Sequence, residues 1–543
     1  MTRLDRFDSN AAQPRKSQVY SRVIVLLIVV FVLVGGFFRF NGLGRKFPWM
    51  DECLTQVRVT EYDNLPAASF PDAITTPISV DRLISRIEEK PQQSLAQLID
   101  VKLSRIPEHP PLYYLLAAKA ASLFGNNFVV LRGLASCISL LAFPAMYWLC
   151  LELFGSPLFG TIGIGVASLC PIYVLYAQEA REYSLWIVAG MFSSAALLRS
   201  LRTNRRTDWL VYSLTLVLGL YTHLFFVFNI LAHVTGSGLT FLKEKAYSKS
   251  RGSNFIAAVA LNCLAFAPWG LLFFRESARV GSHAKWFSGT FDVLTIAKRI
   301  MGSFVRTIYD FSFSEQSNVG LNFTTVLNIL PLLLTLTVIG ISFVFVLKTS
   351  NKLARYHILA LVIIPIILTM LGESLTGKVL TQTRYLMPTW LGVQLALIYF
   401  IRQLIARFEQ KSLLALLSKV VVTSIVAASF VSCVLIANAD YWWSKGNAQG
   451  LSVMAEQIED DGALIFTNIR HVPSLLRLAH QLDPQTKLQF SPDFSGTIPD
   501  GIEHTYFVGG VESAPIVEAA GTNLKQLSSL PSEVFTLYEV GPL

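Results

Sequence analysis

The feature that most constrains this chain is a succession of long apolar segments joined by short polar ones. A helix needs roughly 20 apolar residues to cross a bilayer. Hydrophobic residues make up 52% of the 543-residue chain and charged residues only 15%, whereas a soluble domain averages about 25% charged. The sequence therefore predicts a polytopic α-helical membrane protein with about eleven transmembrane helices, at 23–40, 128–150, 157–177, 183–199, 208–222, 224–242, 254–275, 323–347, 356–372, 385–402 and 413–437.

The basic residues predict how the chain is oriented, because Lys and Arg are enriched in cytoplasmic loops. With a cytoplasmic N-terminus in the plasma (inner) membrane, every cytoplasmic segment but 151–156 is basic. Since the positive charges lie in these short loops, topology explains the net charge of +9, and no nucleic-acid partner is expected. The basic segments are 1–22, 199–206, 243–251, 348–355 and 402–411.

The apolar segment 110–124 is too short to be a clear span. It opens with two prolines and contains Lys119, and apolar runs of 10–14 residues are more often interfacial than spanning. Counting it as a span would also move the later basic clusters outside. We therefore expect an interfacial helix on the outer surface, within a first extracytoplasmic loop at 41–127.

The pattern changes near residue 440, where the apolar runs shorten to strand length. Strands are expected at 463–467 and 505–508, and helical spacing lies between them at 472–482. The sequence thus predicts a transmembrane domain at 1–439 and a small extracytoplasmic α/β domain at 440–543. No chemistry is assigned to the second domain.

Three charged strings lie at the outer ends of apolar segments, where such side chains are costly unless they pair or do chemistry. With the predicted topology all three share one side of the bilayer, which favours a membrane-embedded active site over a plain multi-spanning scaffold. The candidate residues are Asp51 and Glu52, Glu108 and His109, and Glu179, Arg181 and Tyr183.

Each string has a chemical and a purely structural interpretation. Asp51 can act as a general base if partial desolvation raises its pKa, or Asp51-Glu52 is an exposed acidic pair. His109 is fixed by the prolines after it, or it only precedes a helix. Arg181 can bind phosphate with its planar guanidinium, or it forms local ion pairs in a turn.

Further candidates lie near the same surface. Arg132 falls a turn inside the second span, and Lys378 and Arg384-Tyr385 lie in the last outer loop. These cations could face a lipid-linked phosphate or anchor the chain to membrane lipid head groups. His223 lies at an outer turn, where a structural histidine is the more common case. The spacing shows no metal site, and whether a divalent ion takes part is left open.

Taken in order, these strings resemble the GT-C glycosyltransferases, in particular the branch of protein O-mannosyltransferases and lipid A aminoarabinose transferases (glycosyltransferase family 39-like). The resemblance covers roughly residues 20–400. It rests on Asp51-Glu52, His109-Pro110-Pro111-Leu112, Arg132, Pro171 with Arg181 and Tyr183, and Arg384-Tyr385 with Pro388.

The resemblance implies a hexosyl- or pentosyltransferase that uses a polyprenyl-phosphate sugar donor. Asp51 is then the base, supported by Glu52 and His109. The donor phosphate would be bound by Arg132, Arg181, Lys378 and Arg384, with Tyr385 beside them, and transfer would proceed by inverting single displacement. The loop 276–322 is too short for the β-trefoil insert of the protein-mannosylating members, so the acceptor, a lipid, glycan or protein, stays open.

Two other functions remain compatible with the sequence. A transporter or flippase of lipid-linked sugars would often show internal repeats and polar groups at mid-membrane, and neither is visible here. A non-catalytic membrane assembly protein would use the outer domain as its binding module.

Overall fold

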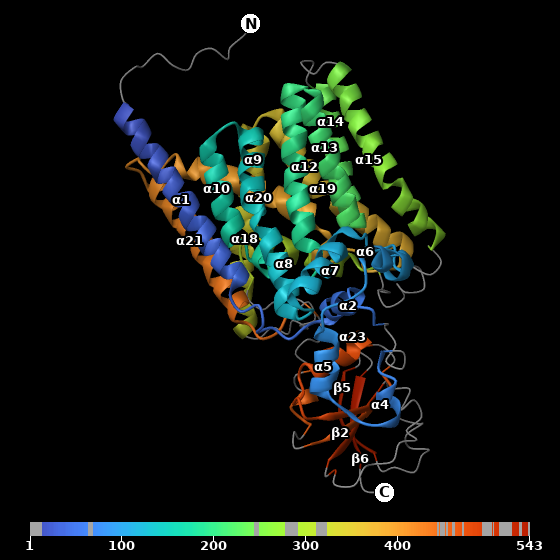
Figure 1. Ribbon diagram of the computed structural model, residues 1–543. Coiled ribbons are helices and arrows are strands. Elements are labelled where there is room, and N and C mark those ends of the chain that lie inside the picture. Colours follow the sequence, from blue (N-terminus) through green and yellow to red (C-terminus); the bar gives the residue numbers. More distant parts are fainter. Residues whose placement is uncertain are drawn as a thin grey trace.

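In the computed structural model the chain forms a helical bundle with a small sheet domain at one end (Figure 1). The N-terminal helix lies along one side of the bundle, and the sheet domain lies below it, so the molecule is elongated. The structure describes residues 14–62, 69–243, 249–276, 291–310, 323–442, 445, 451, 454–458, 462–469, 472–490, 502, 504–509, 524–530 and 535–540.

The bundle is that of an integral multi-pass membrane protein. Among the described residues eight helical stretches are long and apolar enough to cross a membrane, or nine if one bent pair counts as a span. The eight lie in α1 (Pro14–Phe40), α8–α9 (Phe128–Leu140 and Ala142–Phe154), α12 (Tyr183–Thr203), η3–α14 (Leu224–Phe226 and Val227–Lys243), α15 (Lys249–Arg275), α18 (Phe323–Thr349), α19 (Lys352–Thr376) and α21 (Leu413–Asn438).

Two more helices lie in the same bundle without meeting that test. α13 (Arg206–Thr222) has 17 residues, short of the roughly 20 that a crossing needs, and α20 (Met387–Ile405) is almost wholly buried among other helices. Both coincide with predicted spans, so the number eleven stays a prediction. The chain breaks between α13 and η3 at His223, where the sequence predicted a division.

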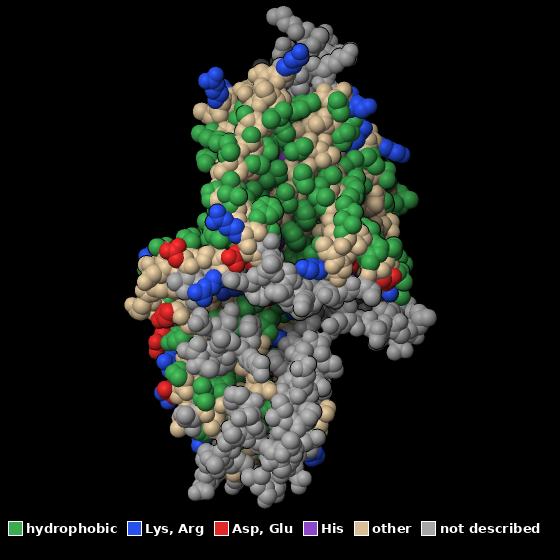
Figure 2. Space-filling model, turned by 90° about the vertical axis from the view of Figure 1, so that its right-hand side faces the viewer, with side chains coloured by type: hydrophobic (Ala, Val, Ile, Leu, Met, Phe, Trp, Pro, Cys, Tyr) green, Lys and Arg blue, Asp and Glu red, His purple; other side chains and the backbone are tan. Residues whose placement is uncertain are grey.

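The outer surface of the bundle is apolar. Figure 2 shows a broad hydrophobic surface over the helices, with Lys and Arg side chains at the end far from the sheet domain. Exposed Leu210, Leu214 and Leu218 on α13 and Ile256 and Leu264 on α15 contribute to it. Such a surface would be costly in water but is matched to lipid.

The predicted span 157–177 is not one straight helix. It consists of α10 (Pro157–Leu169) and α11 (Pro171–Ala177), which meet at an angle of 61°. Pro171 cannot continue the helical hydrogen-bond ladder. The buried Arg39 of α1 compensates, because its Nη2 donates to Ala167 O (2.9 Å) and its Nη1 to Ser168 O (3.3 Å). The bend directs α11 toward the turn at 178–182.

A mixed sheet joins β1 (Ile78–Ser79) to five strands of the C-terminal part, with the strand order β1-β3-β2-β4-β6-β5 in the described residues. β2 runs parallel to both β3 and β4, and the remaining pairs are antiparallel. The predicted strands 463–467 and 505–508 correspond to β2 and β4, and the predicted helix to α23. The elements are β2 (Leu464–Thr467), α23 (Val472–Ala479), β3 (Lys487–Phe490), β4 (Thr505–Gly509), β5 (Leu524–Leu530) and β6 (Phe535–Val540).

The segment 41–127, which was predicted as the first outer loop, is largely helical in its described residues, and part of it belongs to the sheet domain. β1 (Ile78–Ser79) pairs with β3, and α2 (Met50–Arg58) packs on α23, with Cys53 and Val57 in the core of the sheet domain. α7 (Leu112–Phe124) has 13 residues and lies at the end of the bundle nearest the sheet domain (Figure 1). The other elements are α4 (Asp72–Thr75), α5 (Val80–Glu88), α6 (Leu95–Gln97), η1 (Leu98–Lys102) and η2 (Leu103–Arg105).

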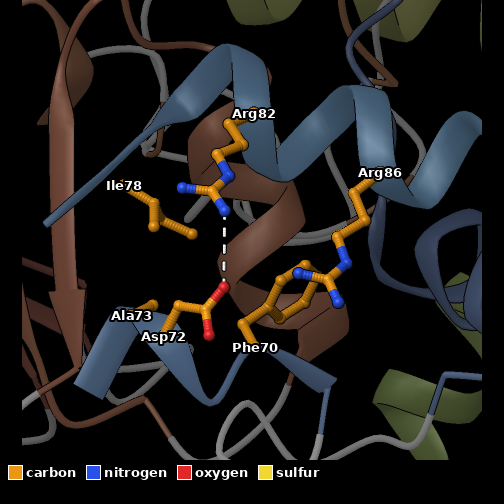
Figure 3. Close-up of a pocket in the computed structure, with 6 residues that line it drawn as sticks. All are labelled: Phe70, Asp72, Ala73, Ile78, Arg82 and Arg86. Carbon is orange, nitrogen blue, oxygen red and sulfur yellow. Dashed lines mark hydrogen bonds and ion pairs between the residues drawn. The ribbon is translucent and has the colours of Figure 1, made fainter. Parts of the chain in front are cut away.

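A shallow hollow beside β1 is closed by side chains of this loop. Arg82 Nη2 contacts Asp72 Oδ2 at 3.3 Å, and the Arg86 guanidinium lies 5.7 Å from the centre of the Phe70 ring (Figure 3). Both charged groups of the Asp72–Arg82 pair are more than half exposed. An exposed pair of this kind contributes about 0–1 kcal/mol.

Candidate active site

Asp51 lies between two arginines that come from distant parts of the chain. It occupies the first turn of α2, and its Oδ2 is 3.2 Å from Arg384 Nη1 and 4.0 Å from Arg181 Nη2. Burial by itself raises the pKa of Asp51, but Arg181 and then Arg384 outweigh it and hold the pKa below its usual value. The carboxylate is therefore ionised at neutral pH.

Glu52 and Arg132 form a closed ion pair next to Asp51. Arg132 Nε donates to Glu52 Oε1 and Nη2 to Oε2, both at 2.8 Å. Glu52 also accepts from the Ala180 N–H at 3.0 Å, and Arg132 Nη1 donates to the carbonyls of Leu43 and Lys46. Both side chains are buried, and every arm of the guanidinium is engaged. The pair thus joins α2, α8 and the turn after α11.

His109 meets the same cluster from the loop before α7. Its Nδ1 lies 3.8 Å from Glu182 Oε1, and Glu182 is 3.2 Å from Arg181 Nη2. Tyr114 donates its hydroxyl to Glu182 Oε2 at 3.4 Å. Burial, and after it the charge of Arg58, lowers the pKa of His109 to about 3. His109 is therefore a neutral imidazole at physiological pH.

A lysine from beyond the last span completes the cluster. Lys445 Nζ lies 3.1 Å from Glu179 Oε2 and 4.0 Å from the centre of the Trp49 ring. Tyr176 and Tyr183 flank the ammonium group at 4.9 and 5.6 Å. Burial raises the pKa of Glu179 to about 7, while the neighbouring Lys445 opposes the shift. The pKa of Glu179 therefore lies much nearer neutral pH than that of an exposed glutamate.

The remaining predicted residues lie at the edge of the cluster or outside it. Tyr385 follows Arg384 in η5 (Thr383–Tyr385), and its ring centre lies 6.3 Å from that of His223, which stacks on Trp186. Glu108 is partly buried beside His109. The Lys378 side chain makes no hydrogen bond or ion pair with the part of the chain that the structure describes.

The loop that carries Arg384 is held by α17 (Val293–Val305). Arg306, just after α17, donates to Thr383 Oγ1 at 3.1 Å, and Ser303 contacts the same hydroxyl. Glu373 at the end of α19 accepts from the N–H groups of Leu380 and Thr381. These contacts give the Arg384 guanidinium a defined position opposite Asp51.

The cluster can bind an anion and accept a proton. Arg181 and Arg384 present planar cationic groups suited to phosphate, and Asp51 between them is an ionised base. Within the described residues no group of three or more His, Cys, Asp or Glu side chains is placed to share a metal ion.

Sequence reasoning missed several members of this site. Lys445 follows Tyr441-Trp442-Trp443 after the last span, and only the fold brings it to Glu179. Lys46 is another, because its Nζ donates to Gln178 Oε1 at 2.7 Å. Burial, followed by the charge of Arg132, lowers the pKa of Lys46 to about 7. The one available signal was a basic residue next to interfacial aromatics, which is common at membrane surfaces.

Comparison with known proteins supports the fold. No known protein-family model and no curated protein matches the sequence. Among solved structures, the chain is similar to ArnT from Cupriavidus metallidurans bound to undecaprenyl phosphate, with a TM-score of 0.50 and 12% identity over 96% of this chain and 99% of that one. The predicted GT-C fold is thereby confirmed.

A weaker likeness is to the oligosaccharyltransferase AglB from Archaeoglobus fulgidus in complex with an inhibitory peptide and a dolichol-phosphate. The TM-score is 0.49 with 10% identity, over 91% of this chain and 70% of that one.

Proposed function

We propose that this protein is a glycosyltransferase that moves a sugar from a polyprenyl-phosphate donor to an acceptor on the extracytoplasmic side of the membrane. The observation that carries the proposal is the convergence of Asp51 with Arg181 and Arg384. These residues are separated by 130 and 333 positions in the sequence, yet their charged groups lie within 4.0 Å of one carboxylate.

The arrangement suits a lipid-linked phosphate donor. The cluster lies at the end of the bundle that carries the sheet domain (Figure 1), where the head group of a membrane lipid would be. Departure of the sugar leaves negative charge on the phosphate, and fixed cations at that position stabilise the transition state. Arg181 and Arg384 are assigned to this role. The ArnT structure with undecaprenyl phosphate, which has a similar fold, is compatible with such a donor.

Asp51 is assigned as the base that takes the acceptor proton. Its arginine partners lower its pKa, and a base is most effective when its pKa is near the working pH. A phosphate bound between Arg181 and Arg384 would neutralise the charges that lower the pKa. Donor binding would therefore raise the pKa of Asp51 and make it a better base when the sugar is in place. A single displacement with inversion follows, with Asp51 acting on the acceptor.

Glu52 and Arg132 are assigned to holding Asp51 rather than to binding the donor. Arg132 was predicted as a phosphate ligand, but its nitrogen donors are directed at Glu52 and two carbonyls. A phosphate could reach it only by breaking a buried bidentate pair. His109 would likewise orient Glu182 and, through it, Arg181.

The proposal is tested by incubating the purified protein in liposomes with a panel of polyprenyl-phosphate sugars and membrane extract, with and without chelator. The expected result is a product in which the sugar has left the lipid phosphate. The Asp51→Asn variant should lose this product, and Asp81→Asn, which changes an exposed acid on α5, should retain it. Movement of intact donor across the bilayer without sugar transfer would instead identify a flippase.

A further inference from the structure

Lys445 is the member of the site that the C-terminal chain supplies. It follows α21 on a segment that lies against the chain leading into α2. Phe47 N donates to Asp440 O at 2.9 Å, and Arg45 Nη1 donates to Asn438 Oδ1 at 2.8 Å. Trp442 is fully buried, and its ring centre lies 5.4 Å from Lys46 Nζ. This packing fixes the point from which Lys445 enters the site.

The ammonium of Lys445 is held beside the proposed phosphate site. It shares the Trp49 ring with Arg384, whose guanidinium carbon lies 5.5 Å from the ring centre. It shares the Tyr183 ring with Arg181, whose guanidinium carbon lies 5.9 Å from that centre. Lys445 is therefore a neighbour of both arginines assigned to the phosphate, although its own ion pair is with Glu179.

With Glu179 ionised, the ion-paired charges around Asp51 are balanced without a substrate. The cations joined by these contacts are Arg181, Arg384 and Lys445, and the carboxylates are Asp51, Glu182 and Glu179. A sugar phosphodiester adds one negative charge, and the departing phosphate adds a second. Buried charges need partners, so the site requires an additional positive charge during the reaction.

We propose that Lys445 is an exchangeable cation, which Glu179 holds when no phosphate is bound and which the donor phosphate takes over. The inference rests on the proposed function. When Lys445 turns to the phosphate, Glu179 stays buried without its cation and takes a proton from solvent. The site then gains one positive charge for the incoming phosphate. A segment beyond the last span would thereby control whether the site can hold its donor.

The exchange makes donor binding depend on pH. Loss of Lys445 raises the pKa of Glu179 further above its present value of about 7. Binding should therefore be tightest below pH 7 and weaken as the pH rises above it, because the bound state carries an extra proton. Glu179 is faced by Lys445 from the C-terminal segment and by Asp51 and Glu52 from α2. Lys46 also titrates near pH 7, so the comparison must be with a variant that keeps Lys46.

The test measures binding of undecaprenyl phosphate to the full-length protein in nanodiscs by calorimetry, in two buffers of different ionisation enthalpy, from pH 6.5 to 9. Lys445→Met should weaken binding at least about tenfold, since a charge-assisted hydrogen bond is lost, and Lys445→Arg should restore most of it. Glu179→Gln should bind as tightly as the wild type or more tightly, and should lose both the proton uptake and the decline above pH 7.

The different effects of Lys445→Met and Glu179→Gln on binding distinguish an exchangeable lysine from an ion pair that only stabilises the fold. If the pair only holds the fold, Lys445→Met and Glu179→Gln weaken binding alike, and the inference is wrong. Lys525→Met, which breaks a lysine–glutamate pair on the exposed face of β5, is the matched control and should change nothing. The inference alone fails under one set of results. In that case the wild-type protein binds undecaprenyl phosphate and Arg384→Met weakens the binding, but Lys445→Met and Glu179→Gln both behave as the wild type. No binding by the wild type overturns the proposed function as well.

Discussion

The Glu52–Arg132 pair provides a quantitative test of how the site is built. Glu52→Gln leaves the Arg132 guanidinium buried without a counter-charge and places an amide N–H₂ where an acceptor is needed. Removing one partner of a buried ion pair costs about 3–5 kcal/mol. The matched change Asp72→Asn breaks the exposed pair with Arg82, whose side chains are 54% and 60% exposed, and should cost at most about 1 kcal/mol.

Thermal unfolding in detergent, followed by tryptophan fluorescence, distinguishes the two variants. At about 2 °C per kcal/mol, Glu52→Gln should lower Tm by roughly 6–10 °C and Asp72→Asn by no more than about 2 °C. The double change Glu52→Leu with Arg132→Met removes both charges, so it should recover part of the loss. Recovery is incomplete because the Ala180 N–H loses its acceptor. Equal Tm values for Glu52→Gln and Asp72→Asn would refute the reasoning.

Three further outcomes are expected. Asp51→Asn should lower the transfer rate by about 10²–10⁴-fold, the usual contribution of a general base, and a product assay in which this variant keeps full activity would exclude the role. Arg384→Met should raise the KM for the polyprenyl-phosphate donor at least about tenfold, whereas Arg82→Met should leave it unchanged. Burial lowers the pKa of His109 to about 3 in the folded protein. As the pH falls below about 6.5, the unfolded chain therefore binds a proton at His109 before the folded protein does, and the free energy of unfolding decreases. Tm measured at pH 7 and pH 4.5 should therefore fall less in His109→Gln than in the wild type, and an equal fall would contradict the assignment.

The sequence was sufficient to predict a helical membrane bundle with a small sheet domain, because the thickness of the bilayer sets the length of a spanning apolar helix. Each predicted span has helical residues at its position. The sheet domain also takes in β1 and α2, so it is not confined to the residues after 440. The bend at Cys170 was not predicted. Pro171 gave a signal for it, but a proline inside an apolar run is also tolerated in straight spans, and Arg39 cannot be recognised as the compensating donor without the fold.

The sequence also predicted most residues of the candidate site, but not which of them form ion pairs with one another. Asp51, Arg181 and Arg384 were predicted together from their common side of the membrane. Arg132 was predicted to bind phosphate, whereas the structure directs it at Glu52, and no spacing rule connects two residues 80 positions apart. Lys445 was not predicted as a site residue, because its position depends on how the chain after α21 packs along the chain before α2. Such long-range contacts are set by tertiary packing, which local patterns do not encode.

The most direct test of the central claim is a structure of the protein bound to a polyprenyl-phosphonate sugar that cannot be transferred. The phosphonate oxygens should lie within about 3 Å of a guanidinium nitrogen of Arg181 or Arg384, with the anomeric carbon facing the Asp51 carboxylate. A head group bound beyond hydrogen-bond reach of both arginines, or at the opposite end of the bundle, would contradict the claim.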